Sequence, residues 1–126
     1  MWEPDLNVTP RTDDFACGTL IAEVLAPEPV GTLLFVNHLP NWQLTFEHER
    51  ELQTVIAART IEQIAEGRGF RHVVLSGDLD ATPDAASVRF LRGRQSLGGM
   101  SVCYRDAWGA PIPGSPDTPS LPRIRS

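Results

Sequence analysis

The chain has 126 residues, which is enough for one small domain, and its hydrophobic fraction of 41% is ordinary for a soluble globular protein. The net charge of −5 argues against a nonspecific nucleic-acid binder, although not against an enzyme that reaches a phosphodiester through a metal ion. No apolar run approaches the roughly 20 residues of a membrane span, and the start lacks a signal-peptide pattern, so we expect a cytoplasmic protein with no membrane span.

The first quarter of the chain predicts an arm and a hairpin. Residues 1–15 are polar and are interrupted by two prolines, which predicts an irregular N-terminal arm. Residues 16–25 alternate between inward and outward positions, as a strand does, and residues 32–36 form an apolar run that is typical of a buried strand. Because the turn between them is short, we expect the two strands to pair as an antiparallel hairpin.

The longest periodic segment, residues 45–66, predicts a helix that ends at Gly67 and Gly69. We interpret His48 and the glutamates of its first turns as a solvated face. A short apolar run, residues 73–75, then predicts a third strand. A strand, a long helix and a strand in sequence form a crossover unit, which would place the second and third strands parallel.

Two carboxylates, Asp78 and Asp80, follow the third strand at alternate positions. If the backbone stays extended there, both side chains project to the same side. Thr82 and Pro83 give a helix start signal, and we expect a short helix over residues 84–92. Open α/β sheets place ligand and metal sites at this end of their strands. The acids therefore either face water in a polar loop or supply oxygen ligands to Mg²⁺ or Mn²⁺.

The segment Ser76-Gly77-Asp78-Leu79-Asp80-Ala81-Thr82-Pro83 resembles the GD(F/L)NA-x-P signature of the endonuclease/exonuclease/phosphatase family. The resemblance implies an α/β (α+β) fold, with residues 16–108 forming part of a four-layer α/β/β/α sandwich of the DNase I-like type. It also implies phosphoester hydrolysis with Mg²⁺ or Mn²⁺. Asp78 falls on the catalytic Asp, which would orient or deprotonate the attacking water. Asp80 stands where most members have Asn, and would contact the phosphate or the metal.

The predicted second strand leads directly into Val36-Asn37-His38-Leu39, which resembles the family's Asn-Thr-His-Leu motif with the Thr missing. The resemblance implies that His38 helps to stabilise the phosphate and that Asn37 binds substrate, and it leaves open which of the two positions is the active one. Taken alone, a surface or packed imidazole is the alternative for His38. Because both strands end at one edge of the sheet, we expect His38 to lie close enough to the two carboxylates to share a cation.

The rest of the chain adds a basic cluster and a tail. Arg89 is either an exposed helix end or a substrate-binding rim residue that contacts phosphate. Asp106-Ala107-Trp108 extends the family match as a structural piece. Residues 109–126 are rich in proline, and we expect a disordered tail or a truncated or frame-shifted reading. The family's early Asn, metal-binding Glu and closing Asp-His pair are not located, so we expect little or no turnover from this chain alone.

Two other functions stay open. Asp78 to Thr82 also resembles the DxDGT motif of haloacid-dehalogenase-type phosphatases, in which the first Asp is the nucleophile, although that family needs a later Lys and this chain has no Lys. The other alternative is a non-catalytic α/β interaction module or remnant. Nucleic acid, phospholipid and inositol phosphate are all hydrolysed on the phosphoesterase scaffold, so the substrate class stays open, as does the oligomeric state.

Overall fold

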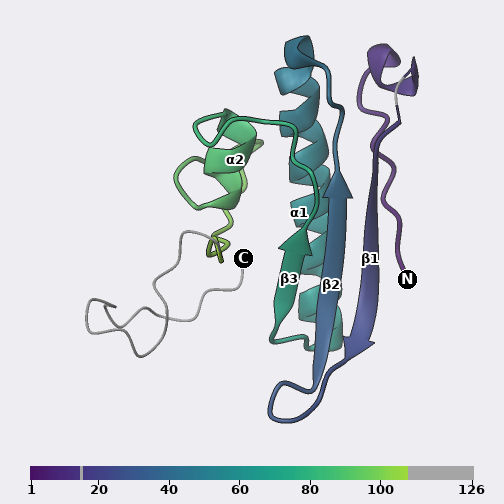
Figure 1. The fold of residues 1–126 in the computed structure, drawn as a ribbon, viewed down its shortest axis with the longest axis vertical. Helices are drawn as coiled ribbons and strands as arrows, with labels where there is room; N and C mark the ends of the chain where they lie inside the picture. Colours follow the sequence, from purple (N-terminus) through teal and green to yellow (C-terminus); the bar gives the residue numbers. More distant parts are fainter. Residues whose placement is uncertain (15, 108–126) are drawn as a thin grey trace.

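The computed structural model describes residues 1–14 and 16–107 (Figure 1). The predictions for Trp108 and for the tail, 109–126, lie outside the described residues. The elements in chain order are η1 (Pro10–Asp14), β1 (Gly18–Leu25), β2 (Thr32–Leu39), η2 (Leu44–Phe46), α1 (Glu47–Arg68), β3 (Val73–Ser76) and α2 (Ala86–Leu91). Within the described ranges the chain is therefore an α+β fold with a three-stranded mixed sheet, and the predicted fold class is confirmed at this level.

The sheet has the order β1-β2-β3, with β2 in the centre. β1 and β2 pair antiparallel from Gly18↔Leu39 to Leu25↔Thr32, which confirms the predicted hairpin. β2 and β3 pair parallel from Leu34↔Val73 to Asn37↔Ser76, and α1 connects them, which confirms the predicted crossover. The carboxyl ends of β2 and β3 therefore meet at one edge of the sheet.

β2 is three residues longer than the predicted strand, because Asn37, His38 and Leu39 continue the ladder with β1. The prediction that His38 follows the strand is therefore wrong: His38 lies inside β2, directly opposite Thr19. In the sequence, the polar residues Asn37 and His38 indicated that the buried strand ends at Val36. The strand can extend because Thr19 of β1 lies opposite His38 of β2, and the two side chains form a hydrogen bond.

Helix α1 lies along one face of the sheet (Figure 1). Its main contact is a cluster of buried residues from β1, β2, α1 and the chain that follows α1: Ile21, Leu34, Val36, Ile61, Ala65 and Phe70. A second cluster joins α1 to α2 and its following loop: Val55, Ala58, Phe90, Leu91 and Val102. The helix runs through Gly67 and ends at Gly69, which adopts the left-handed conformation (φ 72°), so only the second glycine ends it as predicted. Among the described helices, none has the length and apolarity to cross a bilayer.

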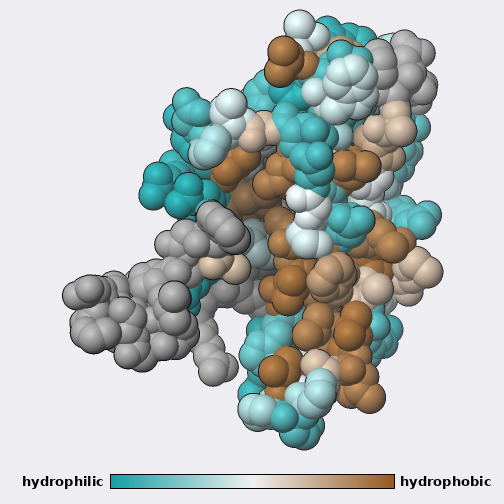
Figure 2. All heavy atoms as spheres, viewed as in Figure 1, coloured by the Kyte–Doolittle hydropathy of each residue, from teal (hydrophilic) through white to brown (hydrophobic). Residues whose placement is uncertain are grey.

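The opposite face of the sheet is apolar and open. Five large apolar side chains project from it, each between 39% and 43% exposed: Leu20, Val24, Phe35, Leu39 and Val74. Figure 2 shows hydrophobic residues gathered over the strands on the side that faces away from α1. In the part of the chain that the structure describes, α1 thus covers one face of the sheet while the other remains accessible to water.

Candidate functional site

The loop that carries the candidate acids leaves the sheet at Gly77, directly after β3. Gly77 has φ 136°, and a β-carbon at this position would overlap the carbonyl group of His38. Only glycine therefore allows the chain to pass so close to β2 at this point. The contact holds the start of the acidic loop against the end of β2.

The two carboxylates lie together, but not for the predicted reason. Asp80 adopts a left-handed conformation (φ 50°), and its backbone N–H donates to Oδ1 of Asp78 at 3.3 Å. The backbone is therefore turned rather than extended, and the argument from alternate positions is wrong. The pKa of the Asp80 carboxyl is raised, first by partial burial and then by the charge of Asp78 and a hydrogen bond to it. The turn thus holds the Asp78 carboxylate against the Asp80 backbone, near enough to the Asp80 carboxyl group for its charge to act on it.

His38 points away from this loop, to the α1 side of the sheet, and only 1% of it is exposed. Its Nδ1 lies 2.6 Å from the hydroxyl of Thr19, and its Nε2 lies 3.3 Å from the hydroxyl of Thr54. Burial lowers the pKa of the ring to about 4, so the imidazole is neutral near pH 7. His38 is therefore a packed imidazole, the alternative that the sequence left open. It does not lie with the two carboxylates at the end of the strands.

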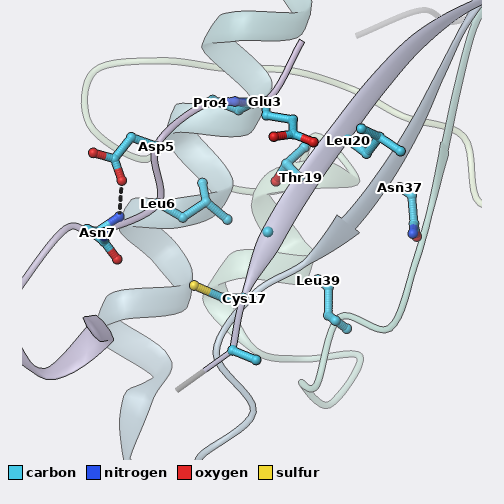
Figure 3. A pocket seen from close by; sticks show the side chains of 12 residues that line it. Glu3, Pro4, Asp5, Leu6, Asn7, Cys17, Thr19, Leu20, Asn37 and Leu39 are labelled. Atoms are coloured by element: carbon cyan, nitrogen blue, oxygen red, sulfur yellow. Dashed lines mark hydrogen bonds between the residues drawn. The ribbon is translucent and has the colours of Figure 1, made fainter. Parts of the chain in front are cut away.

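Asn37 occupies the other face of β2, in a row with Leu20 of β1 and Ser76 of β3. Its side chain borders a cavity of about 550 Å³ between the N-terminal arm and β1 (Figure 3). Most of the cavity lining comes from two segments, residues 3–7 of the arm and 16–20 at the start of β1. Among the predicted site residues, Asn37 is the one that borders this cavity, so the cavity is separate from the carboxylate pair.

Arg89 lies on α2 and is exposed. The pKa of Asp84 is lowered mainly by a hydrogen bond from the Thr82 side chain, and the charge of Arg89 lowers it further. The pKa of Glu51 is raised mainly by burial, and the charge of Arg89 opposes that rise. α2 begins at Ala86, two residues later than predicted, after a turn in which the Ala85 N–H donates to the Thr82 carbonyl. The described interactions of Arg89 are thus with Asp84 and Glu51 rather than with the acidic pair.

The sequence reasoning missed a buried arginine on the first turn of α1. Only 4% of Arg50 is exposed. Its guanidinium donates to the carbonyl of Asn41 at 3.0 Å, to that of Leu44 at 3.4 Å and to that of Gln43. The Arg50 side chain therefore helps to fix the loop that follows β2. In the sequence, Arg50-Glu51-Leu52-Gln53 is a loose match to an R-x-x-Q-like stretch of the resembled family's helix, and that match does not indicate this role.

The interpretation of the early α1 glutamates as a solvated face is wrong for two of them. Glu47 pairs with Arg50 at 3.2 Å and accepts hydrogen bonds from Ser87 at the start of α2. Glu49 is 5% exposed, and its carboxylate lies 3.3 Å from the guanidinium of Arg11. The surrounding loops, which the sequence pattern does not place, cover this end of the helix.

Among residues 1–14 and 16–107, no group of three or more His, Cys, Asp or Glu side chains is arranged to hold a metal ion. No family model matches the chain, and no curated protein is similar enough to it to count as a match. The resemblance to the phosphoesterase signature therefore rests on sequence motifs, in residues 36–39, 76–83 and 106–108.

Proposed function

We propose that this chain carries part of a metal-dependent phosphoesterase site of the endonuclease/exonuclease/phosphatase type, with Asp78 and Asp80 as its acidic residues. The observation that supports the proposal most is the turn at Asp80, whose backbone N–H donates to the Asp78 carboxylate at the carboxyl ends of two parallel strands. Two carboxylates in contact repel each other when both are ionised, and a cation between them removes that repulsion. The edge of the sheet is also where α/β proteins bind their ligands.

The two acids fit a hard divalent cation. Mg²⁺ commonly takes one or two carboxylates from the protein and completes its shell with water and substrate phosphate oxygens. Asp78 and Asp80 would hold the ion, and when bound it would polarise the phosphate ester. The left-handed turn at Asp80 keeps the two acids together, because the Asp80 backbone N–H donates to the Asp78 carboxylate.

The residues of the chain would then divide the work. Asp78 is exposed, and its carboxylate would orient or deprotonate the attacking water. Asp80 would lie on the phosphate side of the ion. His38 would support the edge from behind rather than contact the phosphate, because both of its ring nitrogens are within hydrogen-bonding distance of threonine hydroxyls inside the protein. We propose no role in phosphate binding for Arg89, whose described interactions are with other acids.

The open face of the sheet supports the finer fold proposal, a sandwich of the DNase I-like type. In a sandwich, a second sheet stacks about 10 Å away and its side chains interdigitate with those of the first. The five apolar residues on the open face, together with Asn37 in their midst, provide the apolar surface that such a sheet would cover. The same face also suits a non-catalytic interaction module, which is the second candidate function.

A titration with Mn²⁺, followed by ¹H–¹⁵N correlation spectra of the 126-residue chain, tests the proposal. We expect paramagnetic broadening of the amides of residues 77–82, loss of that broadening in Asp78→Asn, and retention in Asp84→Asn, which removes an exposed charge from the same loop. Hydrolysis of bis-p-nitrophenyl phosphate should be slight, and any turnover should disappear in Asp78→Ala. A wild-type spectrum that Mn²⁺ leaves unchanged would contradict the phosphoesterase proposal and favour the interaction module.

A further inference from the structure

One ion pair on the first turn of α1 connects the loop after β2 to the start of α2, and α2 directly follows the loop that carries Asp78 and Asp80. Nε of Arg50 lies 3.2 Å from Oε2 of Glu47, three residues earlier on the helix. The Arg50 side chain is 5% exposed and that of Glu47 is 29% exposed. The pair therefore lies largely inside the protein, where its hydrogen-bonding groups need fixed partners.

Arg50 supplies the link to the first loop. Its two terminal nitrogens donate to three carbonyl groups of the chain that runs from the end of β2 into η2: those of Asn41, Gln43 and Leu44. Next to it on α1, the Gln53 side chain accepts from the Asn41 N–H at 2.9 Å and donates to the Asn41 side-chain oxygen at 2.7 Å. This loop consequently follows any movement of the first turns of α1.

Glu47 supplies the link to the second loop. Its Oε1 accepts from the backbone N–H of Ser87 at 3.2 Å and from the Ser87 hydroxyl at 2.7 Å. Ser87 lies in α2, immediately beyond the loop that carries Asp78 and Asp80. The positive charge of Arg50 also acts on the Asp80 carboxyl, and it opposes the rise in the pKa of that group. The pair thus acts on the acidic loop through a hydrogen bond and through its field.

We infer that Arg50 and Glu47 are positioning residues of the acidic site: together with Ser87 they form a clamp that fixes the loop after β2 and the start of α2 to the same part of α1, and so orient the carboxylates of Asp78 and Asp80. The inference rests on the proposed function. It assigns a purpose to a largely buried ion pair on the first turn of α1, a turn that contributes no residue to either apolar cluster.

The chemistry of the clamp depends on the shape of the guanidinium. Its planar fork reaches several acceptors in fixed directions, whereas the ammonium of lysine is a point charge on a flexible stem. Arg50→Lys therefore keeps the charge near Asp80 and loses the geometry. Arg68→Lys is the matched control, because Arg68 is also on α1 and also forms an ion pair, with Glu23 at 3.2 Å, but its side chain is 55% exposed.

The experiment measures Mn²⁺ affinity and amide hydrogen exchange in the full chain for wild type, Arg50→Lys, Ser87→Ala and Arg68→Lys. Loss of a group that orients a metal ligand commonly lowers affinity by about 10- to 100-fold. We expect a drop of about tenfold or more in Arg50→Lys, a smaller drop in Ser87→Ala and none in Arg68→Lys. In Arg50→Lys, exchange should rise in both loops, residues 41–46 and 77–87, with the sheet still protected.

Ser87→Ala tests the clamp in a chain that should still fold, because it removes one hydroxyl and leaves the ion pair between Arg50 and Glu47 in place. If the clamp acts as one unit, the effects of Arg50→Lys and Ser87→Ala on affinity will not add in the double variant. Unchanged affinity in both single variants, with wild type binding Mn²⁺, would overturn the inference and leave the proposed function standing. If wild type binds no Mn²⁺, the proposed function fails, and exchange confined to one loop in Arg50→Lys would overturn the clamp as well.

Discussion

The buried imidazole of His38 predicts a specific loss of stability in mild acid. Burial lowers the pKa of the folded ring to about 4, from the ordinary value of 6.5 for an accessible ring. As the pH falls through this window, the unfolded chain takes up the proton first, so the free energy of unfolding decreases. At about 1.36 kcal/mol per pH unit, the loss is roughly 2 kcal/mol at pH 5 and roughly 3 kcal/mol at pH 4. Above about pH 7.5 the ring is neutral in both states and contributes no pH dependence.

Urea unfolding followed by circular dichroism between pH 7.5 and pH 4.5 measures this effect. Carboxylates titrate in the same range, so the comparison is between wild type and His38→Gln, which keeps a hydrogen-bonding side chain and cannot titrate. We expect the extra loss of stability in wild type to be absent from His38→Gln and present in His48→Gln, which removes a partly exposed ring from α1. Parallel pH profiles for wild type and His38→Gln would refute the reasoning.

Two further variants test the packing. Gly77→Ala places a methyl group against the backbone of His38 at a position with φ 136°, so we expect the free energy of unfolding to fall by about 3 kcal/mol or more. Gly67→Ala, in α1 with open space around it, should raise the free energy of unfolding by roughly 0.5–1 kcal/mol. Thermal melting of both variants compares the two effects. Phe90→Ala empties the centre of the second core cluster and should lose about 3–5 kcal/mol in urea unfolding, and a loss below about 1 kcal/mol would show that this cluster does not support α2.

The order and pairing of the strands could be predicted from the sequence because they depend on local patterns of apolar and polar residues. Alternation over residues 16–25, an apolar run over 32–36 and a long helical period over 45–66 gave the hairpin and the crossover, and the structure confirms both. Each of these signals depends on neighbours within a few positions along the chain.

The site was less accessible, because its geometry depends on residues far apart in the sequence. His38 lies on the same face of β2 as Leu34 and Val36, because side chains alternate along a strand. The prediction ended this strand at Val36, and the pairing that extends it involves β1 residues far away in the sequence. The turn at Asp80 uses a left-handed conformation that a reading of extended backbone cannot foresee. Arg50 and Glu47 look like ordinary surface charges until the loops that cover them are in place.

The bare side of the sheet has a practical consequence for anyone who handles the protein. Apolar strand faces that meet water tend to associate with one another, and mutual charge repulsion is what keeps the molecules apart. The calculated isoelectric point is about 5.1, so that repulsion vanishes in mildly acidic buffer. We expect precipitation near pH 5 that dilution or alkaline buffer relieves.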